Sequence, residues 1–287
     1  MSNSTIMQVG VIGGGQMGSG IAEVCARAGL EVVVVEVDAT AAESAEGRVR
    51  SSLERAASRG KISAGEVTEI LARVAFTPDF DALADRDLVV EAASEDEQIK
   101  LELFRRVGAL LKKDDAVLAS NTSSIPIVKL GAVSGRAEKV MGVHFFNPAP
   151  VMQLVELIPS LTTAPETLDR MRGFVGEALG KEPIEATDRA GFVVNSLLVP
   201  YLLSAIRMYE AGYASAADID KGMVLGCGHP MGPLALADLI GLDTIRAIGV
   251  SMYEEFKEPL YSPPPLLDRM VDAGLLGKKA GHGFYAY

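Results

Sequence analysis

The sequence predicts an α/β domain with a mostly parallel sheet, followed by an all-helical domain. Short β-branched runs alternate with helix-favouring stretches over the first two-thirds of the 287 residues, and from about Ala186 only helical patterns follow. Strands separated by helices are typical of a parallel sheet with right-handed crossovers. At about 150 residues per domain, the length also fits two domains. We expect a boundary near Thr187, with domains at 1–186 and 187–287.

The expected strands are short and rich in valine and isoleucine, as strands buried on both faces are. Gly29 stands where the glycine that ends a helix belongs. We expect strands at Ile6–Ile12, Glu31–Glu36, Asp87–Val90, Ala116–Ala119 and Val140–Val143, and helices at Gln16–Ala28, Ala39–Ser58 and Ser63–Arg73.

In the second domain, glycine and proline separate the helical patterns at Gly226–Gly228, Pro230–Pro233 and Pro263–Pro265. We expect helices at Phe192–Ala211, Ala216–Leu225, Leu234–Leu239, Asp243–Phe256 and Leu266–Ala273.

Composition excludes several classes of protein. With 48% hydrophobic and 23% charged residues the chain can build a globular core, and no apolar run reaches the length of about 18 that a membrane helix needs. The start, Met1–Thr5, is short and polar, so we expect no signal peptide. Two cysteines are too few for a disulfide framework. A net charge of −11 argues against nucleic-acid binding. We predict a cytoplasmic protein with no metal site and no membrane or nucleic-acid partner.

A glycine-rich turn carries the strongest local signal. Gly13, Gly15 and Gly18 form a G-x-G-x-x-G pattern that follows a strand and opens a helix, and Gln16 and Met17 lie inside it. The first glycine permits the tight turn, the second lets a pyrophosphate approach, and the third allows close packing of helix and strand. The N–H groups at the start of the helix then bind the anion. This predicts a Rossmann-like dinucleotide site, although a glycine turn in another α/β fold would look similar.

Glu36 closes the second expected strand, eighteen residues after Gly18. A carboxylate there accepts hydrogen bonds from the ribose hydroxyls and repels a 2′-phosphate. The next residues are Val37 and Asp38 rather than a cation. We therefore predict NAD as the cofactor.

A histidine and a glutamate form the candidate acid–base pair. His144 follows a strand-like run, and Glu156 lies twelve residues later in another one, so that a hairpin return would bring the carboxylate beside the imidazole. Such a partner would fix the tautomer for proton exchange with an alcohol. A core histidine is the alternative. Upstream, Ser120–Ser124 follows another strand, and its hydroxyls can face a substrate, cap a helix at Ile125–Leu130, or do both, one hydroxyl for each role.

Taken together, the motifs resemble the L-3-hydroxyacyl-CoA dehydrogenases, and most closely the bacterial 3-hydroxybutyryl-CoA dehydrogenase type. The resemblance covers the whole chain. It rests on the order and spacing of GGGQMGSGIA, VEAASED, SNTSS, HFFNPAPVMQLVE, GFVVNSLLVPYL, HPMGPLALADLIGLD and GKKAGHGFY. It implies reversible oxidation of a short-chain (S)-3-hydroxyacyl-CoA to the 3-oxoacyl-CoA, with hydride transfer to NAD. It also implies a homodimer.

The resemblance implies a role for each matching residue. His144 is then the general acid and base with Glu156 as its orienting partner, and Ser123 and Asn195 contact the reacting oxygen of the substrate. The implied cofactor contacts, beyond the glycine turn and Glu36, are Glu95, Lys100, Ser123, Asn147 and Lys279. The implied coenzyme A contacts are Ser52, Arg59, Ser123 and Asn147.

Arg59 departs from the family, which often has lysine at this position. It belongs to a basic cluster in residues 48–61 that suits the phosphates of coenzyme A, although a solvated helix face explains the cluster equally well. Two alternative functions remain: a related sugar-acid dehydrogenase, and a non-catalytic NAD-binding structural protein.

Overall fold

The computed structural model describes residues 5–287. Positions 1–4 of the polar start lie outside the described residues, and the absence of a signal peptide stays a prediction. The chain divides into two compact units, Met1–Asp188 and Arg189–Tyr287, each with its own hydrophobic core. Among the described residues, no helix is both long enough and apolar enough to cross a bilayer.

The first unit is built on one sheet whose strand order is β3-β2-β1-β4-β5-β6-β7-β8. Only β6 and β7 pair antiparallel, so the predicted mostly parallel sheet is confirmed. The strand order reverses between β1 and β4, which is where open α/β sheets bind ligands. The strands are β1 (Gln8–Ile12), β2 (Glu31–Val35), β3 (Val74–Thr77), β4 (Leu88–Glu91), β5 (Val117–Ser120), β6 (Val140–Phe145), β7 (Leu154–Pro159) and β8 (Glu182–Glu185).

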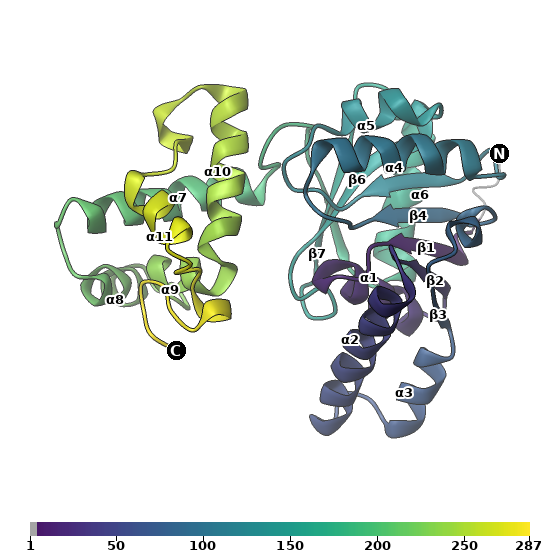
Figure 1. Ribbon diagram of the computed structural model, residues 1–287, viewed down its shortest axis with the longest axis horizontal. Coiled ribbons are helices and arrows are strands. Elements are labelled where there is room, and N and C mark those ends of the chain that lie inside the picture. The colour runs from purple at the N-terminus through teal and green to yellow at the C-terminus, as the bar shows by residue number, and fades with distance from the viewer. Residues whose placement is uncertain (1–4) are drawn as a thin grey trace. The chain divides into compact units, whose positions relative to one another are not determined.

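Helices cover both faces of this sheet. On one face, alternate strand residues such as Val9 and Val11 share a core with Ile21 of α1 and Met171 of α6. On the other face lie α4 and α5, side by side (Figure 1). The pair α2 and α3 extends away from the sheet. The helices are α1 (Gln16–Arg27), α2 (Ala39–Ser58), α3 (Ala64–Leu71), α4 (Glu97–Leu110), α5 (Ile127–Ser134) and α6 (Pro165–Gly173). Burying a side chain such as Ile21 adds about 1.5–3 kcal/mol to the free energy of unfolding. This core therefore holds in place the strand ends that carry the site.

The structure adds elements that the sequence pattern does not single out. β3 and β8 are the two edge strands, only four residues each and partly exposed, so their apolar runs are too short to be distinguished from loop sequence. The amphipathic helices α4 and α6 are also new. Several strands end later than expected: Glu91 and Ser120 are the last residues of β4 and β5, and His144 lies inside β6.

The second unit is helical, as predicted, with α7 (Val194–Glu210), α8 (Ala216–Cys227), α9 (Pro233–Ile240), α10 (Leu242–Phe256) and α11 (Pro265–Asp272). Its core joins Leu202 and Ile206 of α7 to Leu234 of α9 and Ile245 of α10. The carboxylate of Asp238 accepts hydrogen bonds from the backbone N–H groups of residues 284 and 285, which fastens the C-terminal loop to α9.

Candidate active site

The glycine-rich turn joins β1 to α1 in the geometry that a bound dinucleotide requires. Gly13 has a φ of +88°, a left-handed conformation that favours glycine. A Cβ atom built on Gly18 would lie 1.7 Å from the carbonyl oxygen of Gly13, so only glycine fits there. A Cβ atom built on Gly15 would meet no described atom within 4 Å, which leaves open space at the start of α1. That space and the N–H groups of the helix start fit a pyrophosphate.

Glu36 braces the same turn. Its Oε1 accepts the backbone N–H of Gly14 at 2.6 Å, and the carbonyl of Gly14 accepts hydrogen bonds from Arg48 at 3.0 Å and from the Ser19 hydroxyl at 2.6 Å. A carboxylate has several acceptor sites, so Glu36 can hold the turn and still accept a ribose hydroxyl. The position of Arg48 along α2 gives no sign of this contact in the sequence.

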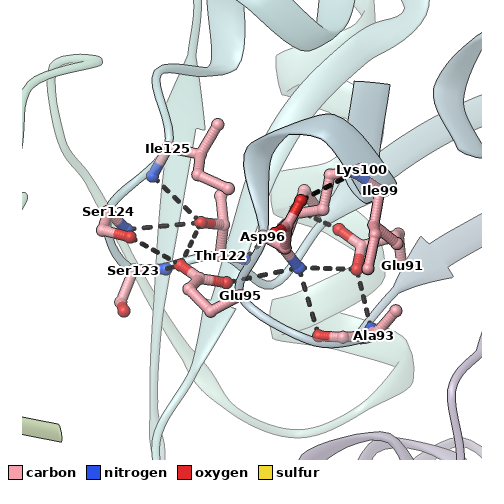
Figure 2. Close-up of polar contacts among 11 residues, drawn as sticks. Glu91, Ala93, Glu95, Asp96, Ile99, Lys100, Thr122, Ser123, Ser124 and Ile125 are labelled. Atoms are coloured by element: carbon pink, nitrogen blue, oxygen red, sulfur yellow. Dashed lines mark hydrogen bonds and ion pairs between the residues drawn. The ribbon is translucent and has the colours of Figure 1, made fainter. Parts of the chain in front are cut away.

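A second polar cluster lies where β4 and β5 end (Figure 2). Glu91 is fully buried and lies 2.6 Å from Nζ of Lys100, whose side chain is 1% exposed. Nζ of Lys100 is also 3.3 Å from Oε2 of Glu95. Burying an ionised group without a partner would cost several kcal/mol, about enough to unfold a marginally stable domain. Glu91 and Lys100 can therefore be buried only because they are paired with each other.

Glu95 fastens the loop that carries Ser123. Its Oε1 accepts hydrogen bonds from the Ser123 backbone N–H at 3.1 Å, from the Ser124 hydroxyl at 2.8 Å and from the Thr122 hydroxyl. Burial raises the pKa of Glu95, but the charge of Lys100 and these hydrogen bonds outweigh it, and the pKa lies below its usual range. The cluster thus brings the predicted residues Glu95, Lys100 and Ser123 together.

The hydroxyls of this loop do not cap helix α5. The first backbone N–H groups of that helix, of Ile127 and Val128, each donate to the carboxylate of Asp188 at 2.8 Å. The Thr122 hydroxyl does accept the backbone N–H of Ile125, where the helix was expected to begin, at 3.0 Å, but α5 itself begins only at Ile127. The Ser120 hydroxyl lies deeper, fully buried against Oε2 of Glu91 at 2.6 Å.

The candidate acid–base pair forms across the antiparallel strands β6 and β7. His144 and Glu156 are direct partners in the register, and Nδ1 of His144 lies 2.7 Å from Oε2 of Glu156. Glu156 is 0% exposed and His144 is 7% exposed. The ring of Phe146 packs edge-on against the imidazole at 4.7 Å between centroids. The backbone N–H of Phe145 donates to Oδ1 of Asn121 at 2.8 Å, which ties the histidine strand to the loop that carries Ser123.

A pocket of about 810 Å³ lies in the first unit between α1, α2 and the loop after β6. Its lining includes the predicted residues Gln16, Ser52 and Asn147, together with Arg48 and Arg55. Pockets of this size are typical of sites for cofactors and other small molecules. Arg59 is not among the lining residues and stands exposed at the C-terminal cap of α2.

Two predicted residues belong to the second unit. Asn195 is buried in the first turn of α7, and Lys279 pairs with the carboxylate of Asp243 at 2.6 Å. The sequence patterns assigned no role to Glu91, and within the expected run Ser120–Ser124 they did not indicate the contacts of Ser120 with Glu91 and of Asn121 with Phe145. A charged residue that ends the apolar run Leu88–Glu91 was the one available signal.

Comparison with known proteins places this geometry in a family. A family model described as "3-hydroxyacyl-CoA dehydrogenase, NAD binding domain" matches residues 8–189, and one described as "3-hydroxyacyl-CoA dehydrogenase, C-terminal domain" matches residues 191–287. The chain belongs to the 3-hydroxyacyl-CoA dehydrogenase family. The resemblance drawn from the sequence motifs is therefore confirmed, and so is NAD as the cofactor of its first domain.

Similar members of the 3-hydroxyacyl-CoA dehydrogenase family match over nearly their full length. The 3-hydroxybutyryl-CoA dehydrogenase of Mycobacterium tuberculosis is 54% identical, with 99% of this chain and 100% of the relative covered. The human mitochondrial hydroxyacyl-coenzyme A dehydrogenase is 41% identical, with 98% and 91% covered. The crystal structure of FadB2 from M. tuberculosis has a TM-score of 0.98, with 54% identity and 99% and 100% covered. That of the (S)-3-hydroxybutyryl-CoA dehydrogenase PaaH1 from Ralstonia eutropha has a TM-score of 0.93, with 43% identity and 99% of each chain covered.

The glycine turn gives a first prediction. Gly15→Ala places a methyl group in open space, so we expect an unchanged melting temperature but at least tenfold weaker NADH binding, measured by fluorescence titration. The added methyl group of Gly18→Ala would clash with the carbonyl oxygen of Gly13, so this variant should lower both the melting temperature and the NADH affinity. Gly173→Ala is the control: it is a helical glycine with open space around it, and it should change neither by much. Unchanged NADH affinity in Gly15→Ala would contradict the role of the turn.

A second prediction concerns Glu95 and pH. A carboxyl group whose pKa is lowered by folding stabilises the protein above its ordinary pKa of 4.5, and this contribution disappears as the pH falls through the folded-state value. The side chain is 38% exposed, so screening limits the effect to about 1 kcal/mol. We expect the stability difference between the wild type and Glu95→Gln, measured by urea unfolding, to shrink from pH 7 to pH 3.5.

Glu102→Gln provides the control for this titration, because Glu102 lies exposed on α4, the helix that also carries Lys100. We expect this variant to follow the pH dependence of the wild type. A stability difference for Glu95→Gln that stays constant down to pH 3.5 would exclude the proposed effect.

Proposed function

We propose that this protein is an NAD-dependent (S)-3-hydroxyacyl-CoA dehydrogenase that interconverts (S)-3-hydroxybutyryl-CoA and acetoacetyl-CoA. The observation that carries the proposal is the buried contact of 2.7 Å between Nδ1 of His144 and the carboxylate of Glu156. The preference for a short acyl chain is supported by the names of full-length relatives such as the 3-hydroxybutyryl-CoA dehydrogenase of M. tuberculosis.

The His144–Glu156 pair supplies the proton chemistry. Glu156 accepts the N–H of Nδ1, so the lone pair of the neutral imidazole lies on Nε2. In the oxidation, Nε2 takes the proton of the C3 hydroxyl while the C3–H bond breaks and the carbonyl forms. The resulting imidazolium is stabilised by the carboxylate of Glu156. In the reduction, the same nitrogen returns the proton to the ketone oxygen. The hydride from C3 would pass to NAD held at the glycine turn, and it would return from NADH in the reverse direction.

Ser123 and Asn195 are proposed to donate hydrogen bonds to the reacting oxygen. A donor aimed at developing negative charge is worth about 3 kcal/mol in the transition state. In the first unit, the support is the position of Ser123 on a loop that Glu95 and Asn121 hold beside the histidine strand. For Asn195 the support is the family resemblance.

We assign the remaining predicted residues to two binding tasks. Residues 1–186 would bind NAD through the glycine turn, Glu36, Glu95 and Lys100, with Lys279 of the helical domain contributing. Asn147 would serve both ligands. The pocket of about 810 Å³ is proposed to hold the coenzyme A part of the substrate, because it combines Ser52 with the cations of Arg48 and Arg55. Arg59 would meet a phosphate at the outer end of the same helix.

Residues 187–287 are proposed to cover the substrate and to pair two subunits. The helical unit exposes large apolar side chains, among them Leu197 at 73% and Leu225 at 74%, which favours burial against a second copy. We also propose that the protein works in the cytosol, because Cys25 and Cys227 are both free thiols. Neither alternative function is favoured: both matched domain models describe hydroxyacyl-CoA dehydrogenases, and the acid–base pair is intact.

The catalytic assignment is tested with His144→Gln. We expect turnover of acetoacetyl-CoA, followed as NADH absorbance at 340 nm, to fall by about 10²- to 10⁴-fold, since general acid–base catalysis contributes that much. The dissociation constant of NADH should change less than threefold. Glu156→Gln should give a smaller loss of turnover, because the imidazole remains but loses its orienting partner.

The control for this test is His229→Gln, since His229 contacts Tyr201 in the helical unit and has no part in the proposed chemistry. It should keep turnover within about twofold of the wild type. Turnover near the wild-type level in His144→Gln would exclude the mechanism. Failure of the wild type to oxidise NADH with acyl-CoA substrates from C4 to C16 would exclude the function.

The subunit pairing is tested by sedimentation. We expect a species of twice the 30.3 kDa chain mass at micromolar concentration. If the face that carries Leu197 or Leu225 forms the interface, Leu197→Glu or Leu225→Glu should shift the sedimenting species from dimer toward monomer. A wild-type protein that sediments as a monomer would contradict the pairing and leave the proposed chemistry untouched.

A further inference from the structure

Glu91 is a buried carboxylate to which the chemistry described so far gives no role. It ends β4 at the switch point of the sheet and is 0% exposed. Its Oε1 accepts hydrogen bonds from Nζ of Lys100 at 2.6 Å and from the backbone N–H of Ala93 at 2.7 Å, and its Oε2 accepts one from the Ser120 hydroxyl at 2.6 Å. Figure 2 shows Glu91 between Lys100 and Ala93. Three donors from three segments converge on this one group.

Lys100 extends this cluster to Glu95. An ammonium group has three protons, and Nζ of Lys100 meets three acceptors: Glu91 at 2.6 Å, the carbonyl of Ala93 at 3.3 Å and Glu95 at 3.3 Å. The side chain is almost wholly buried. Its donors are therefore engaged inside the protein, so that Lys100 links two carboxylates and supports the cofactor site through them.

One end of the cluster supports the glycine turn. Both polar backbone groups of Ala93 are held, the N–H by Glu91 and the carbonyl by Lys100. A Cβ atom built on Gly13 would lie 2.9 Å from Cα of Ala93, so the segment packs directly against the first glycine of the turn. The backbone N–H of Ala92 donates to the carbonyl of Ile12 at 2.8 Å and continues this contact.

The other end supports the loop of Ser123. Glu95 holds the backbone N–H of Ser123 and the hydroxyls of its two neighbours. The Ser120 hydroxyl, which donates to Glu91, also accepts the backbone N–H of Thr122 at 3.2 Å. The loop is thus attached to the side-chain carboxylate of Glu91 by two routes, one through Ser120 and one through Lys100 and Glu95, in addition to the backbone bond from the N–H of Asn121 to the carbonyl of Glu91.

We propose that Glu91 is a positioning residue that sets the glycine turn and the Ser123 loop in one fixed arrangement. The part of this proposal that concerns the substrate rests on the proposed function, whereas the part that concerns NADH does not. Because Lys100 and Ser120 share the one carboxylate, loss of its charge loosens both segments together. Glu91 therefore affects cofactor binding and substrate turnover without touching either ligand.

The experiment compares Glu91→Gln with Asp87→Asn. Asp87 directly precedes the other end of β4 and pairs with Lys113 at 2.6 Å, so it controls for loss of a carboxylate–lysine pair. At a temperature well below unfolding, we expect Glu91→Gln to bind NADH at least tenfold more weakly and to lose at least tenfold in kcat/KM for acetoacetyl-CoA. Asp87→Asn should stay within threefold on both measures.

Hydrogen exchange adds a readout that is independent of activity. In Glu91→Gln the backbone amides of residues 92–95 and 121–125 should exchange at least tenfold faster, while in Asp87→Asn they should exchange as in the wild type. The double variant Glu91→Gln/Lys100→Met also removes the ammonium that has lost its nearest carboxylate partner. It should regain most of the lost melting temperature but keep the weak NADH binding and the fast exchange.

A purely structural role predicts that NADH affinity returns together with stability in the double variant, and this result would overturn the proposal. NADH affinity and exchange in Glu91→Gln within threefold of the wild type would overturn it too. If Glu91→Gln does not fold, NADH affinity and hydrogen exchange measured on the double variant and on Ser120→Ala test the proposal instead. A wild type that binds NADH but turns over no acyl-CoA defeats the proposed function alone, because NADH affinity and exchange still test Glu91.

Discussion

A carboxylate buried away from water must find hydrogen-bond donors, and the candidate site is arranged around two such groups. Glu91 and Glu156 are both 0% exposed and both lie on strands of the sheet. Each takes the side chain of a base at close range, Lys100 at 2.6 Å and His144 at 2.7 Å. Removing one partner of a buried pair typically costs about 3–5 kcal/mol, so the fold itself holds these side chains in place. Such preorganisation is what electrostatic catalysis requires.

The antiparallel pairing of β6 and β7 explains how the acid–base pair is held. In an antiparallel ladder, directly opposed residues project on the same face with Cβ atoms about 5 Å apart, close enough for an imidazole and a carboxylate to meet. His144 and Glu156 are such a pair. A register shift of one residue would move the two side chains to opposite faces. The reversal of direction after β6, in a sheet that is otherwise parallel, therefore has a chemical consequence.

The glycine turn and the acid–base pair could be predicted from the sequence because each has a recognisable local spacing. The turn at Gly13 lies between an apolar strand and a helix start. Glu156 follows His144 by twelve residues, a spacing at which a hairpin brings the two side chains together. Other contacts join residues far apart in the chain, for which spacing gives no sign: the Ser120 hydroxyl reaches Glu91 across 29 residues, and Asp188 caps α5 across about 60. The edge strand β8 was missed because its exposed, polar residues lack the apolar run of a central strand. The roles of Asn195 and Lys279, like those of Glu95, Lys100 and Asn147, came from family resemblance alone.

Cofactor preference and the shape of the glycine turn are coupled through Glu36. The carboxylate that is suited to accept ribose hydroxyls also holds the N–H of Gly14 at 2.6 Å, and the carbonyl of the same residue is held by Arg48 and Ser19. Replacing Glu36 to admit a 2′-phosphate would remove the repulsion of that phosphate and, at the same time, one brace of the turn that binds the pyrophosphate. A change of cofactor in this scaffold therefore requires that the N–H of Gly14 receive another acceptor.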